Sequence, residues 1–177
     1  MSLRVLVTRP RAQASSTIAA IEAQGHQVLP LPCLEIVPVS SDSEQGQANK
    51  YIAMELDAYA HVIVVSTNAA ACFLPLVEDY WPQWPIEQTW WGMGATTKAA
   101  LQDAQLPCVK KPSHGDTSEA LLEDLVPLVK TGDKVLVVRG VGGRETLAQA
   151  LGDMGAQVDY AECYSRQAPT VSAHEVD

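Results

Sequence analysis

The fold is predicted from two copies of one pattern, Val5-Leu6-Val7-Thr8-Arg9 and Val135-Leu136-Val137-Val138-Arg139. Each is an aliphatic, largely β-branched run of strand length that stops at an arginine. Apolar residues at helical spacing follow in both copies, and a glycine (Gly25 or Gly155) then stands where a helix would end. Two residues after each glycine, Gln-Val opens another strand. The sequence therefore predicts a strand–helix–strand unit twice.

The two copies keep one register, since matched residues lie 130 positions apart throughout. Strand–helix–strand units resemble one another for general reasons, which is the alternative to an internal duplication. The shared arginine and the absence of gaps favour duplication. The identical pairs are Val5/Val135, Leu6/Leu136, Val7/Val137, Arg9/Arg139, Gly25/Gly155, Gln27/Gln157 and Val28/Val158.

The block between the copies, at about residues 58–130, alternates strand and helix signals. Strands are predicted over 60–66, 90–94 and 107–110, and helices over 68–80, 96–104 and 117–129. Asp116 and Glu119 have the spacing of a capping box at the start of the last helix. These lengths predict an α/β fold with doubly wound, mostly parallel sheets.

Two polar segments look like connectors. Residues 38–50 are rich in serine and glutamine and follow a proline-marked strand over 28–37, and residues 165–169 follow the second copy. If the ancestral unit included the central block, a second block would follow Pro169, and the whole protein would have about 250 residues. We therefore expect these 177 residues to lack that part.

The composition excludes several classes of protein. The formal charge is −9, from 21 acidic and 12 basic side chains, so we expect no nucleic-acid partner. We expect no membrane partner, because no apolar run approaches the ~20 residues that a membrane helix needs. The first residues lack the pattern of a secretory signal, and a cytoplasmic protein is expected.

A metal site is also not expected. The four cysteines have no C-x-x-C spacing and the four histidines have no ligand spacing, so we interpret the cysteines as buried free thiols.

Residues that follow the predicted strands are the candidates for binding. In parallel α/β sheets, ligands lie beyond the carboxyl ends of the strands, where loops lead into helices. Hydroxyls, glycines and arginines dominate these positions and are suited to an anion. The alternatives are helix capping for the hydroxyls, structural ion pairs for the arginines, a plain turn for the glycines and packing for the tyrosine. The candidates are Thr8, Arg9, Ser66, Thr67, Asn68, Thr97, Arg139, Gly140, Arg144 and Tyr164.

The sequence resembles the uroporphyrinogen-III synthases. Matching stretches in family order are VLVTRP (5–10), GHQVLPLPCLEIVP (25–38), VSTNAAACF (65–73), GATTKAAL (94–101), TSEALL (117–122) and VLVVRGVGGRETLAQALGDMGAQVDYAECYSRQAP (135–169). The resemblance implies two α/β domains joined by a two-stranded connector, with the active site in the cleft between them. Residues 1–37 would be the first half of domain 1, 38–164 the complete domain 2, and 165–177 the connector that returns to domain 1.

The resemblance also implies a reaction. Hydroxymethylbilane, a linear tetrapyrrole with many carboxylates, would lose water and close into a ring with its last pyrrole inverted, on the route to haem, sirohaem and cobalamin. Catalysis would rest on positioning, without metal or cofactor, and we expect a monomer. The alternative is a non-catalytic α/β module that binds an anion or another ligand.

The resemblance implies roles for single residues. Tyr164 would assist departure of the hydroxyl by donating a proton or hydrogen bond, so Tyr164→Phe should lower turnover more than binding. Hydroxyls of Ser66, Thr67 and Thr97 would hold acetate and propionate groups. The family's Tyr-Arg-Arg reads Tyr164-Ser165-Arg166 here, so no role is assigned to residue 165.

Overall fold

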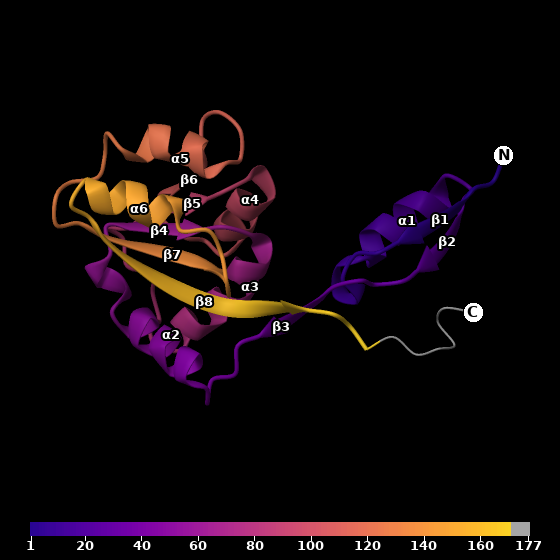
Figure 1. Cartoon of the computed structure of the whole chain (residues 1–177), viewed down its shortest axis with the longest axis horizontal. Helices are drawn as coiled ribbons and strands as arrows, with labels where there is room; N and C mark the ends of the chain where they lie inside the picture. The colour runs from indigo at the N-terminus through magenta and orange to yellow at the C-terminus, as the bar shows by residue number, and fades with distance from the viewer. Residues whose placement is uncertain (171–177) are drawn as a thin grey trace. The chain divides into compact units, whose positions relative to one another are not determined.

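The computed structural model describes residues 1–170 and divides the chain into two compact units. The N-terminal unit contains residues 1–37 and the described residues from Ser165 onward, and the central unit contains Pro38–Tyr164. Each unit is described by itself, with the elements labelled as in Figure 1.

The central unit is built on a mostly parallel sheet. The strands of this sheet run in the order β3-β8-β7-β4-β5-β6, and every pair from β8 to β6 is parallel. Within it, β3 up to Val37 and β8 from Ser165 onward fall in the N-terminal unit. Residues 61–64 and 135–140 are buried, as in strands covered on both faces. The strands are β3 (Glu35–Pro38), β4 (His61–Val64), β5 (Thr89–Gly92), β6 (Val109–Lys110), β7 (Lys134–Gly140) and β8 (Gln157–Gln167).

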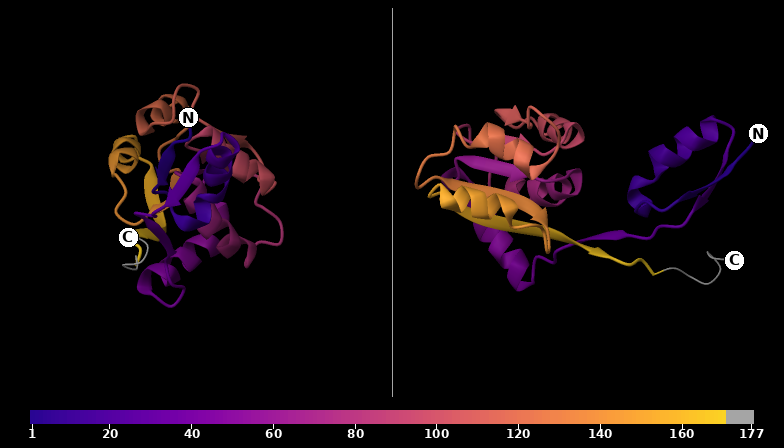
Figure 2. Two further views of the ribbon diagram at one scale, coloured as in Figure 1. Left: turned by 90° about the vertical axis from the view of Figure 1, so that its right-hand side faces the viewer. Right: turned by 45° about the horizontal axis from the view of Figure 1, so that its top comes forward.

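Helices cover both faces of this sheet, as Figures 1 and 2 show. Helices α2, α3 and α4 pack as neighbours, and α5 packs against α6. A core that includes Ile63, Val137, Leu121 and Leu151 joins the sheet to α5 and α6. The helices are α2 (Glu44–Met54), α3 (Thr67–Glu78), α4 (Ala95–Asp103), α5 (Ser118–Leu125) and α6 (Thr146–Asp153), with a short 3-10 turn, η2, at Leu56–Ala58.

The strand order reverses between β4 and β7. From β4 the chain proceeds outward to β5 and β6, and then returns to place β7 on the other side of β4 and β8 beyond it. Ligands of open parallel sheets bind at such a reversal, outside the carboxyl ends of the two strands. The residues after Val64 and Val138 are therefore expected to border a ligand site.

The N-terminal unit contains a smaller version of the same motif. Strands β1 (Arg4–Val7) and β2 (Gln27–Pro30) pair in parallel, with the 3-10 turn η1 (Arg11–Gln13) and helix α1 (Ser15–Ala23) between them. Gly25 follows the helix with φ +77°, as the sequence predicted for a helix end. Leu6 and Leu29 of the two strands are exposed.

The α/β prediction is confirmed, but three local predictions are wrong. The segment 38–50 is not a plain connector, because Ser43 caps α2 by accepting a hydrogen bond from Gly46 N, and Asn49 and Ala53 of that helix are buried. The strand predicted over 28–37 is two strands, separated by residues 31–34. Helix α5 is capped by Thr117 and not by Asp116, because the threonine hydroxyl accepts from Ala120 N.

The cysteine prediction is half right. All four thiols are free, but Cys33 and Cys108 are exposed and Cys72 is partly exposed, so only Cys163 is a buried thiol. Within residues 1–170, no helix has the length and apolar character to cross a membrane, and no cluster of three or more metal-binding side chains occurs.

Candidate functional site

Ser66 stands at the carboxyl end of β4 and begins α3. Its backbone is extended, with φ −161° and ψ 163°, and its hydroxyl accepts a hydrogen bond from Ala69 N at 3.1 Å. The capping alternative is therefore confirmed for this residue. Ser66 is partly exposed, and its hydroxyl has a second partner.

That partner is Tyr164, near the end of β8. The Tyr164 hydroxyl lies 3.2 Å from Ser66 Oγ, and the tyrosine is fully buried. Its ring packs over Gly140, where an added Cβ would lie 2.8 Å from ring carbons Cε2 and Cζ. The structure thus brings together three of the predicted residues, Ser66, Gly140 and Tyr164, where the strand order reverses between β4 and β7.

A β-bulge aims Tyr164 at Ser66. In the ladder between β7 and β8, Arg139 lies opposite Glu162, but Gly140 lies opposite Tyr164, so Cys163 is the extra residue. In a regular ladder Tyr164 would share the face of Glu162, two residues before it. The extra residue turns Tyr164 to the face that α3 covers.

Arg139 is buried within the protein's own contacts. Nε donates to Glu162 Oε1 at 3.2 Å, Nη1 to the Arg144 carbonyl at 3.0 Å, and Nη2 to Glu145 Oε1 at 2.9 Å. The guanidinium carbon lies 3.6 Å from the centre of the Tyr160 ring. This arrangement favours the structural alternative for Arg139 over direct binding of a ligand.

The charges around Arg139 shift several protonation equilibria. Burial lowers the pKa of Arg139, but the hydrogen bond to Glu145 and the charges of Glu145 and Glu162 outweigh it and raise the pKa. Hydrogen bonds from Tyr160 and Arg139 hold the pKa of Glu145 below its ordinary value. Burial and the bond to Glu145 raise the pKa of Tyr160 to about 12.

Sequence reasoning missed Glu145, Tyr160 and Glu162. A signal for Glu162 was present: an arginine on a buried strand needs a carboxylate, and the matched register of two parallel strands places an acid beside it. Glu162 also accepts from Gly142 N at 3.3 Å, so it fills the turn that the glycines were expected to offer to an anion.

The remaining candidates of the central unit differ in exposure. Thr67 is exposed and Asn68 is partly exposed in the first turn of α3. Arg144 is exposed in the loop after β7. Thr97 is 4% exposed in α4, which packs so closely on β5 that a Cβ at Gly92 would lie 2.6 Å from Lys98 N. Thr67, Asn68 and Arg144 are therefore open to solvent, whereas Thr97 is not.

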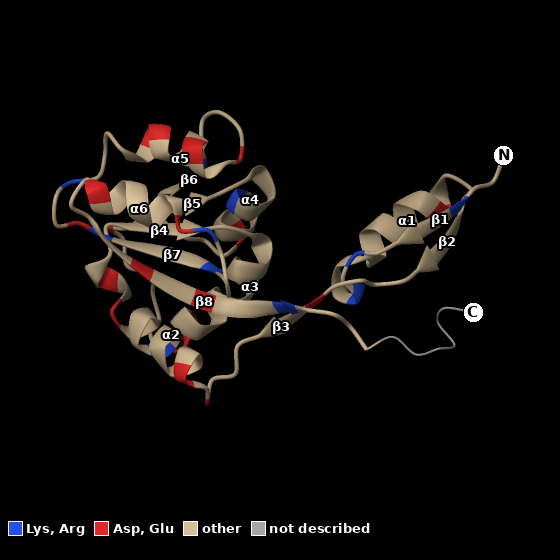
Figure 3. Cartoon of the chain, in the orientation of Figure 1, with Lys and Arg blue, Asp and Glu red and all other residues tan. Residues whose placement is uncertain are grey.

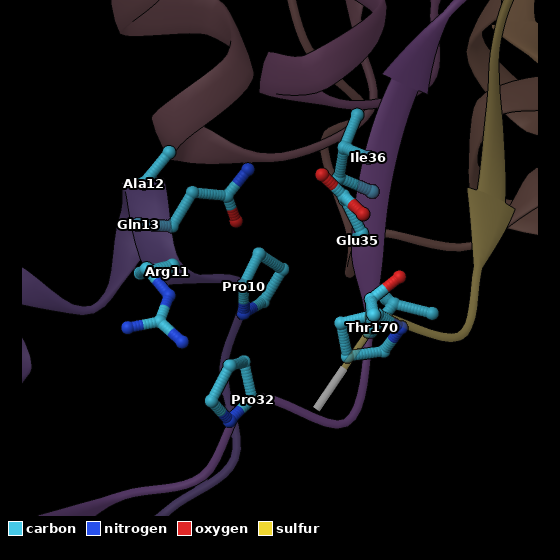
Figure 4. Close-up of a pocket in the computed structure, with 10 residues that line it drawn as sticks. Pro10, Arg11, Ala12, Gln13, Pro32, Glu35, Ile36 and Thr170 are labelled. Atoms are coloured by element: carbon cyan, nitrogen blue, oxygen red, sulfur yellow. The ribbon is translucent and has the colours of Figure 1, made fainter. Parts of the chain in front are cut away.

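Thr8 and Arg9 belong to the N-terminal unit. The Thr8 carbonyl accepts from Cys33 N at 3.1 Å, and Arg9 Nη1 donates to Thr17 Oγ1 at 3.0 Å. A cavity of about 650 Å³ lies just beyond them within the same unit. Figure 4 shows Pro10, Arg11 and Gln13 on one side and Glu35 and Ile36 on the other.

Acidic residues outnumber basic ones by 21 to 12. In Figure 3 the ribbon of α2 and α5 in the central unit carries acidic positions, in keeping with the net charge of −9. An anionic ligand would therefore depend on local donors at the carboxyl edge of the sheet and not on the overall field.

Comparison with known proteins identifies relatives over almost the whole chain. The family model described as uroporphyrinogen-III synthase HemD matches residues 15–177. The uroporphyrinogen-III synthase of Proteus mirabilis is 30% identical over 166 residues, which cover 93% of this chain and 80% of that protein. Those of Salmonella typhimurium and Escherichia coli are each 28% identical over 169 residues, covering 93% of this chain. The chain spans 65% of the length of these last two relatives.

Solved structures share the fold. A mutant uroporphyrinogen III synthase from the extremely thermophilic bacterium Thermus thermophilus superposes with a TM-score of 0.65 at 17% identity, covering 95% of this chain and 64% of that one. The Helicobacter pylori enzyme gives 0.57 at 15% identity, covering 99% and 66%. The fold agrees with the sequence match, and the chain belongs to the uroporphyrinogen-III synthase HemD family.

Proposed function

We propose that this chain takes part in the synthesis of uroporphyrinogen III, by cyclising hydroxymethylbilane with loss of water and inversion of the last pyrrole ring. Family membership supports the proposal. The observation that carries it is the Ser66–Tyr164 hydroxyl pair, which lies at the reversal of strand order where ligands of such sheets bind.

The hydroxyl pair can supply the hydrogen-bond donor that a leaving hydroxyl group requires. A serine hydroxyl donates one hydrogen bond and accepts two. If Ser66 Oγ accepts from Ala69 N and from the Tyr164 hydroxyl, its own proton is directed outward. Because Tyr164 is buried and Ser66 is partly exposed, we propose that Ser66 touches the substrate and Tyr164 supports it as proton source.

Further donors that follow the strands would hold the substrate's carboxylates. Thr67 and Asn68 lie in the first turn of α3, where the helix dipole favours negative charge. Arg144 is the exposed arginine of the loop after β7, and Gly140 brings that loop's backbone to the tyrosine. Thr97 would act by supporting the start of α4. Thr8 and Arg9 would contribute from the N-terminal unit.

The two compact units would correspond to the two domains of the family. The N-terminal unit would be the discontinuous first domain, and the central unit would be the second. We propose that the monomer works in the cytoplasm on this small-molecule substrate, without metal or organic cofactor. Residues 171–177, in the segment proposed to return to domain 1, lie outside the described residues.

The test is the isomer of the product. Hydroxymethylbilane is generated in situ with the purified chain, the products are oxidised, and the type I and type III porphyrins are separated by chromatography. An excess of type III over a heat-inactivated control supports the proposal. Type I alone, the isomer that forms spontaneously, overturns the claim that this chain catalyses the reaction.

A further inference from the structure

The end of β8 is held by an ion-pair network that the proposed reaction leaves unassigned. Glu162 is the last residue of β8 in regular register before the bulge at Cys163, and it lies opposite Arg139. Arg139 Nη2 lies 3.0 Å from Glu162 Oε1 and 2.9 Å from Glu145 Oε1. The arginine side chain is 9% exposed, so the pair with Glu162 is shielded from solvent.

The bulge makes this pair important for Tyr164. Side chains alternate between the faces of a strand, so a change of one residue in register moves Tyr164 to the opposite face. On one side of Cys163, the Arg139–Glu162 pair joins the two strands. On the other side, Val141 N donates to the Tyr164 carbonyl at 2.8 Å.

We infer that Arg139 is a positioning residue, which fixes the bulge through Glu162 and thereby keeps the Tyr164 hydroxyl within reach of Ser66. The inference deepens the proposed function and rests on it for its effect on turnover. The part that concerns the position of the Tyr164 side chain does not depend on catalysis. Arg139 would not bind a substrate carboxylate, because its three nitrogens donate to Glu162, Arg144 and Glu145.

The same pair of strands provides a matched control at its other end. Lys134 Nζ lies 5.5 Å from the Tyr59 ring centre, and the Tyr59 hydroxyl donates to Asp159 Oδ2 at 2.9 Å. Like the cluster of Arg139, Tyr160 and Glu145, it places a cation near a tyrosine ring whose hydroxyl donates to a carboxylate. In that cluster Tyr160 donates to Glu145 Oε2 at 2.7 Å. It lies near the start of β7, away from the bulge.

The first experiment reads the environment of Tyr164 without turnover. Tyrosine labelled with ¹³C at Cζ gives one resonance for each of the five tyrosines, and Tyr164→Phe assigns the resonance of Tyr164. We expect Arg139→Met to shift this resonance and Lys134→Met to leave it in place. If Arg139→Met does not fold by circular dichroism, Glu162→Met removes the acceptor of the same pair. An unshifted Tyr164 resonance in a folded variant overturns the inference.

The second experiment separates positioning from binding by kinetics. A positioning role predicts that Arg139→Met lowers kcat for type III formation about tenfold or more and changes KM less than about twofold. Arg139→Lys should recover part of kcat, because it keeps the charge but loses the planar fork. A large rise in KM at unchanged kcat would make Arg139 a substrate ligand and overturn the inference. If wild type makes no type III isomer, the proposed function fails while the resonance experiment still decides the positioning of Tyr164.

Discussion

The two copies of the strand–helix–strand unit have the same local structure but very different surroundings. β7 pairs with β4 on one edge and β8 on the other, whereas β1 pairs with β2 in a two-stranded sheet. Leu136 is fully buried in β7, and its counterpart Leu6 is 52% exposed in β1. Helix α6 buries Leu147 and Leu151, but α1 buries no residue.

The matched arginines differ in the same way. Arg9 donates to the hydroxyl of Thr17 at an exposed position, whereas Arg139 is enclosed by Glu145, Glu162 and Tyr160. The local pattern therefore specifies strand, helix and helix end in both copies. Neighbouring elements decide which side chains become core and whether an arginine has a structural role.

The largest expected effect tests this difference in burial. Leu136→Ala should destabilise the central unit by about 2–5 kcal/mol, because it removes buried methyl groups and leaves a cavity. Urea unfolding followed by tryptophan fluorescence measures this, since Trp81, Trp84, Trp90 and Trp91 all lie in that unit. Leu6→Ala is the matched control and should leave the transition unmoved. Equal shifts for the two variants would contradict the comparison.

The second prediction concerns the end of the strand, where the two copies differ. Gly140 in the second copy corresponds to Pro10 in the first. Gly140→Ala should cost about 1–3 kcal/mol, because its Cβ would press on the Tyr164 ring. It should also lower type III formation. Gly152→Ala in α6 is the control and should stabilise by roughly 0.5–1 kcal/mol, since nothing lies within 4 Å of its Cβ. Losses of the same size in both variants would exclude the proposed contact.

The third prediction uses the glycines that end the two helices. Gly25 and Gly155 have φ of +77° and +84°, so alanine should cost about 1 kcal/mol at either position. Gly155→Ala should cost more, because its Cβ would lie 2.9 Å from Thr131 Cγ2, whereas nothing lies near Gly25. Urea unfolding reports on Gly155→Ala, and amide exchange over residues 4–30 reports on Gly25→Ala. Thr131→Ser removes that methyl group, so Gly155→Ala made in the Thr131→Ser variant should lose the additional destabilisation. If the additional destabilisation persists, the contact with Thr131 is not its cause.

The smallest effect concerns pH and the Arg139 network, which has no counterpart around Arg9. Because the pKa of Glu145 is lowered in the folded state, its contribution is present above the ordinary value of 4.5 and is lost as the pH falls through the lowered value. Glu145→Gln should therefore lose less stability than wild type between pH 7 and pH 3 in urea unfolding. Parallel losses would show that Glu145 does not stabilise the network.

The sequence was sufficient for the α/β class and for the candidate position of Ser66, because strand ends and caps are local features. It named Tyr164 as a candidate but could not predict the face of β8 on which this side chain lies, because a bulge at Cys163 reverses the face that simple alternation would give. It also predicted a connector where Ser43 and the buried Asn49 support α2. Asn49 donates from Nδ2 to the Glu162 carbonyl at 2.8 Å, a contact across 113 positions that no local pattern reveals.

The most direct test of the central claim compares wild type with Tyr164→Phe and Ser66→Ala in the formation of type III isomer. Both substitutions should lower the rate while binding of the linear tetrapyrrole changes little, because we propose that the hydroxyl pair acts on the leaving group. Ser66→Ala also removes a helix cap, so its stability is measured in parallel. An unchanged rate in Tyr164→Phe would show that the tyrosine hydroxyl does not act in the reaction.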